Sequence, residues 1–371
     1  MKSKWTYRPL GELVSFASGG TPSKKRDGYW GGTIPWISAK TLKTENIDTS
    51  DLFITEEGLK AGSKIAPKGS ILLLTRGSGL FNGIPIARVE KDVAFNQDIK
   101  CLDSYGEVEN EFIFYWLLSQ KDYLMAKVGV TGIGAGKFDL DFLQKLMIPI
   151  PSERERKSIV GFASSISEKI RCNAKVNDNL QQQAQAIYSS MFIDNPDPAW
   201  SHGHLSDLIT VKYGKDHKKL ADGIYPVYGS GGIMRYVERP LYNKESVLIP
   251  RKGTLNNVMY VNQPFWSVDT MFYTEMKLPN VAKFVYHFVK AKDLASMNAG
   301  SAVPSMTTDI LNAMEVVIPS ASALEEFESL VAPMYEAMEA NDVQSKALSQ
   351  IRDTLLPKLM SGEIDVSDVQ L

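Results

Sequence analysis

The pattern of apolar positions divides the chain into two kinds of segment. Short apolar runs broken by Gly, Pro, Asn and Ser, such as TIPWISA at 33–39 and SVLIP at 246–250, are typical of strands joined by turns. Residues 153–192 and 323–361 differ, because they contain almost no Gly or Pro and their apolar positions have a helical period. The pattern therefore predicts two mixed α/β regions, each followed by one long helix.

The first long segment carries an apolar stripe that steps alternately by four and three residues, the a/d spacing of a heptad. The second segment repeats this stripe 168 positions later (Phe327 against Ile159), and Asn173 then matches Asn341. The two helices are therefore predicted to pair antiparallel, bury both stripes and return the C-terminus to the first region. One Asn at a seam position lowers stability but selects one register, so Asn173 and Asn341 are candidate register residues; alternatively, both are partly solvated.

The two halves of the chain also share sequence blocks in the same order. FDLDFLQKLMIPIPS at 138–152 matches MTTDILNAMEVVIPS at 306–320, and four further blocks recur, one of which places Asp98 on Asp269. The offset drifts from 195 (Trp200 against Trp5) to 168 (Asp309 against Asp141), so loops between the blocks differ in length. We therefore expect an α+β chain with a pseudo-twofold internal repeat: two similar mixed α/β domains separated by a pair of long antiparallel helices that form a coiled coil.

The predicted boundaries follow from these patterns. We call residues 1–152 head 1 and residues 201–320 head 2. The remaining segments are a first spacer helix at 153–192, a linker at 193–200, a second spacer helix at 321–361 and a C-terminal tail at 362–371.

Two similar heads with an approximate twofold are suited to DNA half-sites, which are read at a spacing that the protein geometry fixes. Because the heads differ within a shared frame, we expect a split, asymmetric site with one part per head. Lys and Arg neutralise phosphates, while Arg and Asn can read guanine and adenine. The candidates in head 1 are Lys24, Lys25, Arg26, Tyr29, Trp30, Arg76, Asn82 and Lys137; those in head 2 are Lys215, Lys218, Lys219, Ser230, Arg235, Arg251, Lys252, Asn256 and Asn257.

Each of these loops has a simpler interpretation as a solvated turn, and Tyr29 with Trp30 could belong to the core instead. The net charge of −2 and the pI of about 6.2 argue weakly against a nucleic-acid binder. However, the acidic residues of the second long helix offset the basic loops. The two cysteines form no CxxC, and neither a signal peptide nor a run of 18 apolar residues occurs, so we expect a cytoplasmic protein without a membrane segment.

Together with the repeat, the motifs GGTPSKKRDGYWGGTIPW (19–36), YPVYGSGGI (225–233), PRKGTLNNVMYVNQPFWSVDT (250–270) and LLPKLMSGEI (355–364) resemble the specificity subunit of type I restriction-modification systems. The resemblance covers nearly the whole chain. It implies two target-recognition domains on double-stranded DNA and a helix pair that docks two modification subunits, with motor-nuclease restriction subunits joining them. S-adenosylmethionine, and ATP with Mg, are then expected on those partners and no cofactor in this chain. The family tends to have Glu-Gln at the start of the long helix, whereas this chain has Glu155-Arg156.

Motifs for chemistry of the chain's own are weak. GIGAG at 132–136 fits no nucleotide-binding pattern, and His202 and His204 form HxH without a third ligand nearby. Asp269 with EMK at 275–277 imitates part of a nuclease pattern, but head 1 has no equivalent of Glu275. We therefore expect no catalytic residue and no metal. The alternatives are a non-catalytic scaffold of another defence system and, with less support, a nuclease.

Overall fold

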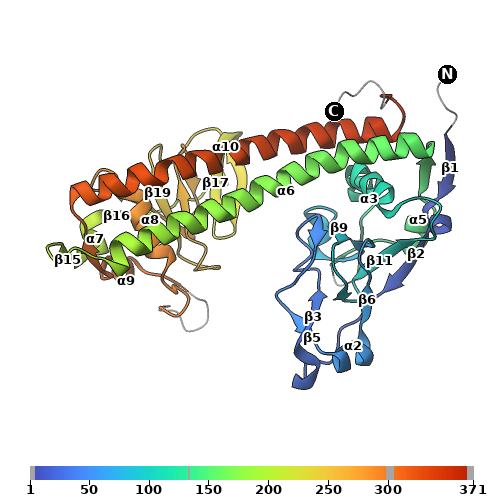
Figure 1. Ribbon diagram of the computed structural model, residues 1–371, viewed down its shortest axis with the longest axis horizontal. Helices are drawn as coiled ribbons and strands as arrows, with labels where there is room; N and C mark the ends of the chain where they lie inside the picture. Colours follow the sequence, from blue (N-terminus) through green and yellow to red (C-terminus); the bar gives the residue numbers. More distant parts are fainter. Residues whose placement is uncertain (1–4, 133, 298–304, 366–371) are drawn as a thin grey trace. The chain divides into compact units, whose positions relative to one another are not determined.

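The computed structural model describes residues 5–132, 134–297 and 305–365 and divides into two compact units (Figure 1). Unit 1 comprises Met1–Cys172 with Gln344–Leu371, and unit 2 comprises Asn173–Val343. The end of the predicted tail, residues 366–371, lies outside the described residues. Each unit therefore contains one head together with a part of each long helix.

Head 1 is built on a five-stranded sheet, mostly antiparallel, with smaller sheets beside it. The five strands, in spatial order, are β2 (Val14–Ser18), β11 (Ile99–Ser104), β7 (Ile71–Leu74), β9 (Ile86–Val89) and β4 (Asn46–Ile47). A four-stranded sheet contains β5 (Phe53–Ile54), β3 (Trp30–Ile37), β10 (Val93–Phe95) and β6 (Lys64–Ala66). A three-stranded sheet contains β12 (Gly129–Val130), β13 (Gly136–Lys137) and β8 (Arg76–Gly77). The strands β1 (Thr6–Pro9) and β14 (Met147–Ile150) form a separate pair. Its helices are α1 (Leu10–Leu13), α2 (Glu56–Gly62), α3 (Asn110–Ser119), α4 (Lys121–Met125) and α5 (Leu140–Gln144), with 3-10 turns η1 (Asp27–Tyr29) and η2 (Ser78–Phe81).

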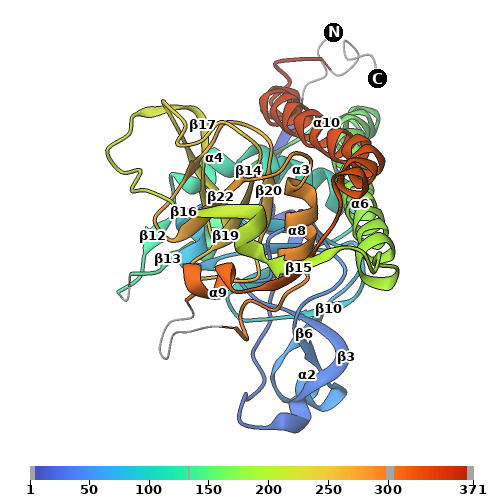
Figure 2. The same cartoon turned by 90° about the vertical axis from the view of Figure 1, so that its left-hand side faces the viewer.

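Head 2 has the same plan with fewer strands (Figure 2). One sheet contains β16 (Ile209–Tyr213), β22 (Met271–Met276), β19 (Ser246–Pro250) and β20 (Met259–Val261). A second contains β18 (Gly232–Val237), β17 (Asp222–Gly229) and β21 (Trp266–Ser267), and β15 (Ser201–His204) pairs with β23 (Glu315–Ile318). The helices are α7 (Leu205–Leu208), α8 (Ala282–Lys290) and α9 (Thr308–Asn312).

The internal repeat is confirmed by the strand pairing within each head. The antiparallel order β2-β11-β7 of head 1 corresponds to β16-β22-β19 of head 2, and the pair β1–β14 corresponds to β15–β23. In head 1 the Asp98 carbonyl accepts from the backbone N–H groups of Thr75 and Arg76, and in head 2 the Thr270 carbonyl accepts from those of Arg251 and Lys252. Asp98 therefore corresponds to Thr270, so the match of Asp98 to Asp269 was wrong by one residue.

The long helices are α6 (Glu153–Ser189), which continues as a π-helical turn at Ser190–Asp194, and α10 (Ala321–Met360). Ser152 and Glu155 form a capping box at the start of α6: the Ser152 hydroxyl accepts from the Glu155 N–H at 3.3 Å, and the Glu155 carboxylate accepts from the Ser152 N–H at 2.9 Å. Glu155 of the Glu155-Arg156 pair thus caps α6, while Arg156 donates to the Glu109 carboxylate at 2.8 Å. At the start of α10, the Ser320 hydroxyl accepts from the Ala323 N–H at 3.2 Å, and alanine offers no reciprocal bond. No helix among the described residues is long and apolar enough to cross a membrane.

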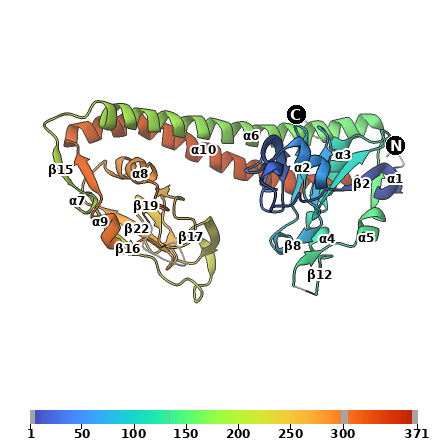
Figure 3. The same cartoon turned by 90° about the horizontal axis from the view of Figure 1, so that it is seen from below.

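Both apolar stripes are covered within their units, because no member of either stripe is exposed. In unit 1, Ile159 and Ala163 of α6 join Leu356 and Leu359 of α10 in the core of head 1. In unit 2, side chains of both helices join the core of head 2: Ala184, Tyr188 and Phe192 from α6, and Leu324, Phe327 and Val331 from α10. In each unit the two helix segments run antiparallel and side by side (Figures 1 and 3). The core of each head is thus completed by side chains from both long helices.

The asparagines in the polar middle of the stripes bond one another within unit 2. Asn173 is 2% exposed, and its Nδ2 donates to the Asn341 carbonyl at 3.3 Å. Asn341 Nδ2 donates to Asn177 Oδ1 at 2.9 Å, and Asn177 Nδ2 donates to the Met338 carbonyl and to Asp342 Oδ1. A shift of one helix along the other would break these bonds in a mostly buried seam. Selection of the register by Asn173 and Asn341 remains a prediction with this physical support.

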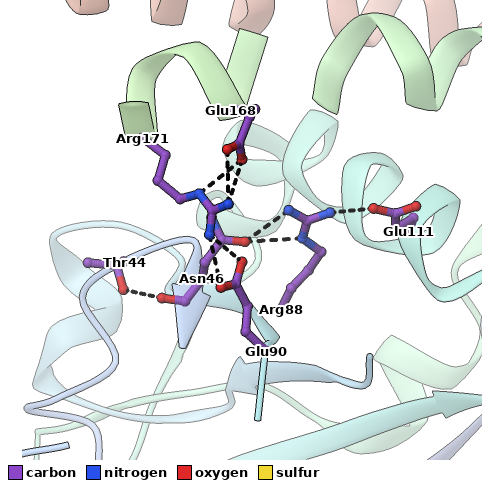
Figure 4. Close-up of polar contacts among 7 residues, drawn as sticks. All are labelled: Thr44, Asn46, Arg88, Glu90, Glu111, Glu168 and Arg171. Carbon is purple, nitrogen blue, oxygen red and sulfur yellow. Dashed lines mark hydrogen bonds and ion pairs between the residues drawn. The ribbon is translucent and has the colours of Figure 1, made fainter. Parts of the chain in front are cut away.

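Polar side chains join head 1 to the helices at the edge of its core (Figure 4). Arg171 of α6 is paired with Glu90 of head 1 and with Glu168, while Arg88 is held by Asn46 and Glu111. Beside them, the buried Arg352 of α10 reaches both carboxylate oxygens of Glu45, at 2.6 and 3.0 Å, and the Ser167 hydroxyl of α6. These contacts orient both helices on head 1.

Head 2 uses a different buried network. Lys283 of α8 is 5% exposed and pairs with Glu245 at 3.1 Å and with Glu328 of α10 at 2.6 Å. His287 is fully buried and forms two hydrogen bonds through its ring. Its Nδ1 lies 2.7 Å from Gln185 Oε1 of α6, and its Nε2 lies 3.0 Å from the Tyr335 hydroxyl of α10. Burial, assisted by the charge of Lys290, lowers the pKa of His287 to about 4. His287 is therefore neutral in the folded protein near neutral pH.

We predict that this histidine makes unit 2 sensitive to acid. Because the folded pKa lies below the ordinary value near 6.5, the stability is complete above pH 6.5 and is lost as the pH falls toward 4, by up to about 3 kcal/mol. Urea unfolding at pH 7 and at pH 5 measures this loss, and the loss should shrink in His287→Gln. A control variant of the exposed His202, His202→Gln, should keep the wild-type dependence. Equal pH dependence in His287→Gln and wild type would contradict the prediction.

Candidate nucleic-acid interface

The basic loop of head 1 is exposed and held firmly at its base. Lys24, Lys25 and Arg26 are all exposed between β2 and β3. The turn η1 that follows them is fixed by Thr55, whose N–H donates to the Tyr29 carbonyl at 3.0 Å and whose hydroxyl donates to the Gly28 carbonyl at 2.8 Å. The loop therefore presents three positive charges on a supported turn.

The two aromatic candidates of this loop have different surroundings. Tyr29 is half-buried, and its hydroxyl accepts from Arg26, whose guanidinium lies 5.5 Å from the ring centre. Trp30 packs edge-on against the buried Trp36, with ring centres 5.2 Å apart, and its Nε1 donates to the Ser23 carbonyl at 3.3 Å. The alternative interpretation therefore fits Trp30, which packs on the small core around Trp36, Ile54 and Ala94.

The other candidates of head 1 lie on neighbouring strands. Arg76 of β8 is directly opposite Lys137 of β13, and both side chains are exposed. Asn82 is exposed just after η2, and its N–H donates to the Gly79 carbonyl. The basic loop connects to this region through Thr21, whose hydroxyl bonds the Gln97 side chain at 2.7 Å, one residue before Asp98. The base of the basic loop is thus bonded to the segment Gln97–Asp98, and the Asp98 carbonyl accepts from the Arg76 N–H.

In head 2, the candidates Lys215, Arg251 and Lys252 contact the segment Ser267–Thr270. Lys215, Lys218 and Lys219 are exposed, and the Lys215 N–H donates to the Ser267 carbonyl at 2.8 Å. Arg251 donates to the Asp269 carbonyl at 3.3 Å, with its guanidinium 5.3 Å from the ring centre of Tyr213. Lys252 is exposed beside it.

Several amide and guanidinium groups proposed for base reading are used within head 2. Arg235 donates to Asp222 at 2.8 Å and to the Leu220 carbonyl at 3.0 Å. Asn256 donates to Asp293 at 3.0 Å and accepts from the Ala295 N–H, and its bond lowers the pKa of the Asp293 carboxyl. Asn257 donates to the carbonyl of Ser230, which lies in the turn between β17 and β18. These bonds fix the orientation of Arg235 and Asn256, and they leave only the remaining N–H groups of each side chain for a base.

Sequence reasoning missed several exposed side chains at this edge. Tyr213 is 52% exposed, and Met234 and Ile233, next to Arg235, are 61% and 43% exposed. Charged and amide side chains make the hydrogen bonds to phosphates and bases, so residue type alone does not indicate these positions. Alternation along β18 could have found Met234, because neighbours of the inward-bonded Arg235 point to the opposite face of the strand.

The edges present cations, hydroxyls and aromatic faces on open surface, which suits an extended anionic ligand.

Among the residues that the structure describes, no group of three His, Cys, Asp or Glu side chains could hold a metal ion. Cys101 is buried and Cys172 is exposed, and both are free thiols.

Comparison with known proteins assigns both halves of the chain to one family. The sequence model of the family described as the type I restriction modification DNA specificity domain matches residues 2–182 and 199–327. The type I restriction enzyme MjaIX specificity subunit of Methanocaldococcus jannaschii is 26% identical, over 98% of this chain and 94% of that protein. The EcoR124I/EcoR124II specificity subunit of Escherichia coli is 28% identical, over 52% of this chain and 49% of that protein.

A solved structure supports the fold. The crystal structure of a type I restriction-modification system S subunit from M. genitalium has a TM-score of 0.55 and 20% identity, and the match covers 96% of each chain.

We predict that replacing Lys24, Lys25 and Arg26 with Ala weakens binding to DNA and makes its salt dependence less steep. Each phosphate contact contributes about 0.9 to the slope of log affinity against log salt concentration, so loss of two or three contacts is readily measured. Fluorescence anisotropy at several salt concentrations gives this slope. An unaltered slope would mean that the loop faces away from the DNA.

Proposed function

The chain belongs to the family of type I restriction-modification DNA specificity subunits, and we propose that each head reads one half of a bipartite, asymmetric DNA site. The observation that carries this proposal is the repeated edge. The same backbone positions, Thr75 and Arg76 in head 1 and Arg251 and Lys252 in head 2, are hydrogen-bonded to equivalent carbonyls, and each edge carries exposed cations. A shared frame with different side chains is what two different half-sites require.

The difference between the heads supports an asymmetric site. Head 1 offers the exposed group Lys24, Lys25 and Arg26, whereas head 2 offers Lys215, Lys218 and Lys219 in a loop of different length. Hydrogen bonds to base edges specify sequence, and phosphate contacts set the position on the duplex. Two edges with different donors would therefore select different bases.

The helix pair would set the gap between the half-sites and dock two modification subunits. Helices α6 and α10 contain 37 and 40 residues, or about 55 and 60 Å of helix at 1.5 Å per residue. Large apolar side chains remain exposed on both: Val176 on α6 at 40%, and Leu330, Val343 and Ile351 on α10 at 46%, 61% and 47%. Exposed apolar groups on a helix suit a protein partner.

The chemistry of the complex would belong to the partners. Modification subunits would use S-adenosylmethionine to methylate adenine N6, and restriction subunits would use ATP with Mg. An adenine amino group in the stack is inaccessible, so base flipping would be a task of the modification subunit. This chain would contribute recognition, not catalysis, in the cytoplasm. A scaffold without DNA recognition would also use the apolar groups of α10, but it would leave the two basic edges without a role.

We predict that exchanging residues 201–305 for the same region of a relative changes one half of the recognised site and leaves the other half unaltered. The graft should retain Lys283, Tyr286 and His287, because these residues bond Glu328, Gln181 and Gln185 of the helices. Sequencing of the DNA that is methylated by the assembled complex identifies both halves. A change in both halves would contradict the assignment of one half to each head.

A further inference from the structure

The two heads share a pair of strand positions that no base-reading role explains. In head 1, Arg76 lies directly opposite Lys137 in an antiparallel ladder. In head 2, Lys252 lies opposite Ser305 in an isolated antiparallel bridge. The surrounding bonds agree: the Phe138 N–H donates to the Thr75 carbonyl, and the Met306 N–H donates to the Arg251 carbonyl, both at 2.9 Å. The two pairs are therefore equivalent in the repeat.

The pair in head 1 is unfavourable by itself. Side chains directly opposite on an antiparallel pair lie about 5 Å apart at Cβ, and like charges there destabilise the sheet. Neither Arg76 nor Lys137 forms a hydrogen bond or ion pair through its side chain with any residue in the described ranges. The nearby Asp98 carboxylate accepts from the side-chain amides of Asn96 and Gln97 and forms no ion pair with Arg76 or Lys137 among the described residues. A polyanion would remove this repulsion.

A glycine lies beside the pair in head 1. Gly129 of β12 is directly opposite Lys137 on the outer strand and is exposed. In head 2 the residue after Lys252 is also glycine, Gly253, with a φ of +85° that side chains rarely adopt. An exposed glycine such as Gly129 lets a ligand backbone approach closely. In unit 1, β8 and β12 lie on the side of the head away from the helix pair (Figure 3).

We infer that these two strand positions form a phosphate clamp, present once in each head, that holds the DNA backbone without reading its bases. The inference rests on the proposed function. In head 1 the clamp has two cations, Arg76 and Lys137. In head 2 it has one cation, Lys252, beside the Ser305 position. The clamp thus sets the register of each head on the duplex.

The test measures affinity for specific DNA against salt concentration, with the protein assembled with its modification subunits. In Arg76→Gln/Lys137→Gln the slope of log affinity against log salt should become less steep by about 0.9 to 1.8, and in Lys252→Gln by about 0.9. The bases selected should not change, because phosphate contacts carry no sequence information. The urea midpoint of the double variant should equal or exceed that of wild type, since the facing charges are removed.

Two controls separate this role from a general loss of charge. Arg76→Lys/Lys137→Arg keeps both cations and should keep the wild-type slope. Lys91→Gln removes an exposed charge in the turn after β9, at the opposite end of the sheet from Arg76, and should leave the slope unaltered. An unaltered slope in Arg76→Gln/Lys137→Gln, or a changed base preference in it, would overturn the clamp. A wild-type complex that binds DNA without selecting any sequence would overturn the proposed function, while the slopes would still decide the clamp.

Discussion

Each head depends on apolar side chains that lie outside it in the sequence. The core of head 1 contains Ile159 and Phe162 of α6 and Leu356 and Leu359 of α10, all nearly inaccessible to solvent. The core of head 2 is closed by Tyr188 and Phe327. Burial of one such side chain contributes about 1.5–3 kcal/mol, so each head gains a large part of its stability from both helices. This constraint explains why the last described residues of the chain belong to the same unit as the first.

The ion pairs between head and helix are arranged oppositely in the two units, because the positive charge lies on the helix in one unit and on the head in the other. In unit 1 the helices supply the cations: Arg171 meets Glu90, and Arg352 meets Glu45. In unit 2 a helix supplies the anion, Glu328, and the head supplies Lys283. Arg352 and Lys283 are buried, so removing the partner of either costs about 3–5 kcal/mol, because its charge stays buried and unpaired. The wrong helix segment on a head would bring like charges together, so the contacts favour the correct pairing.

The two heads and the long helices could be predicted from the sequence, whereas the candidate site could be predicted only in part. The heptad stripes and the repeated blocks predicted the helices and the two heads, because periodicity records which face is buried. The side-chain roles were harder to predict. Arg235 and Asn256 have residue types suited to reading bases, yet tertiary neighbours engage both of them. The pairing of Arg76 with Lys137 joins residues far apart in the chain, and only the strand register reveals it.

The central hypothesis is that the two heads read two separate parts of one DNA site. The most direct measurement is selection from randomised duplexes by the protein assembled with its modification subunits, followed by sequencing of the bound DNA. The account predicts two short blocks of different sequence, separated by a gap of fixed length in which no base is selected. One contiguous block, or no selected bases at all, would contradict it.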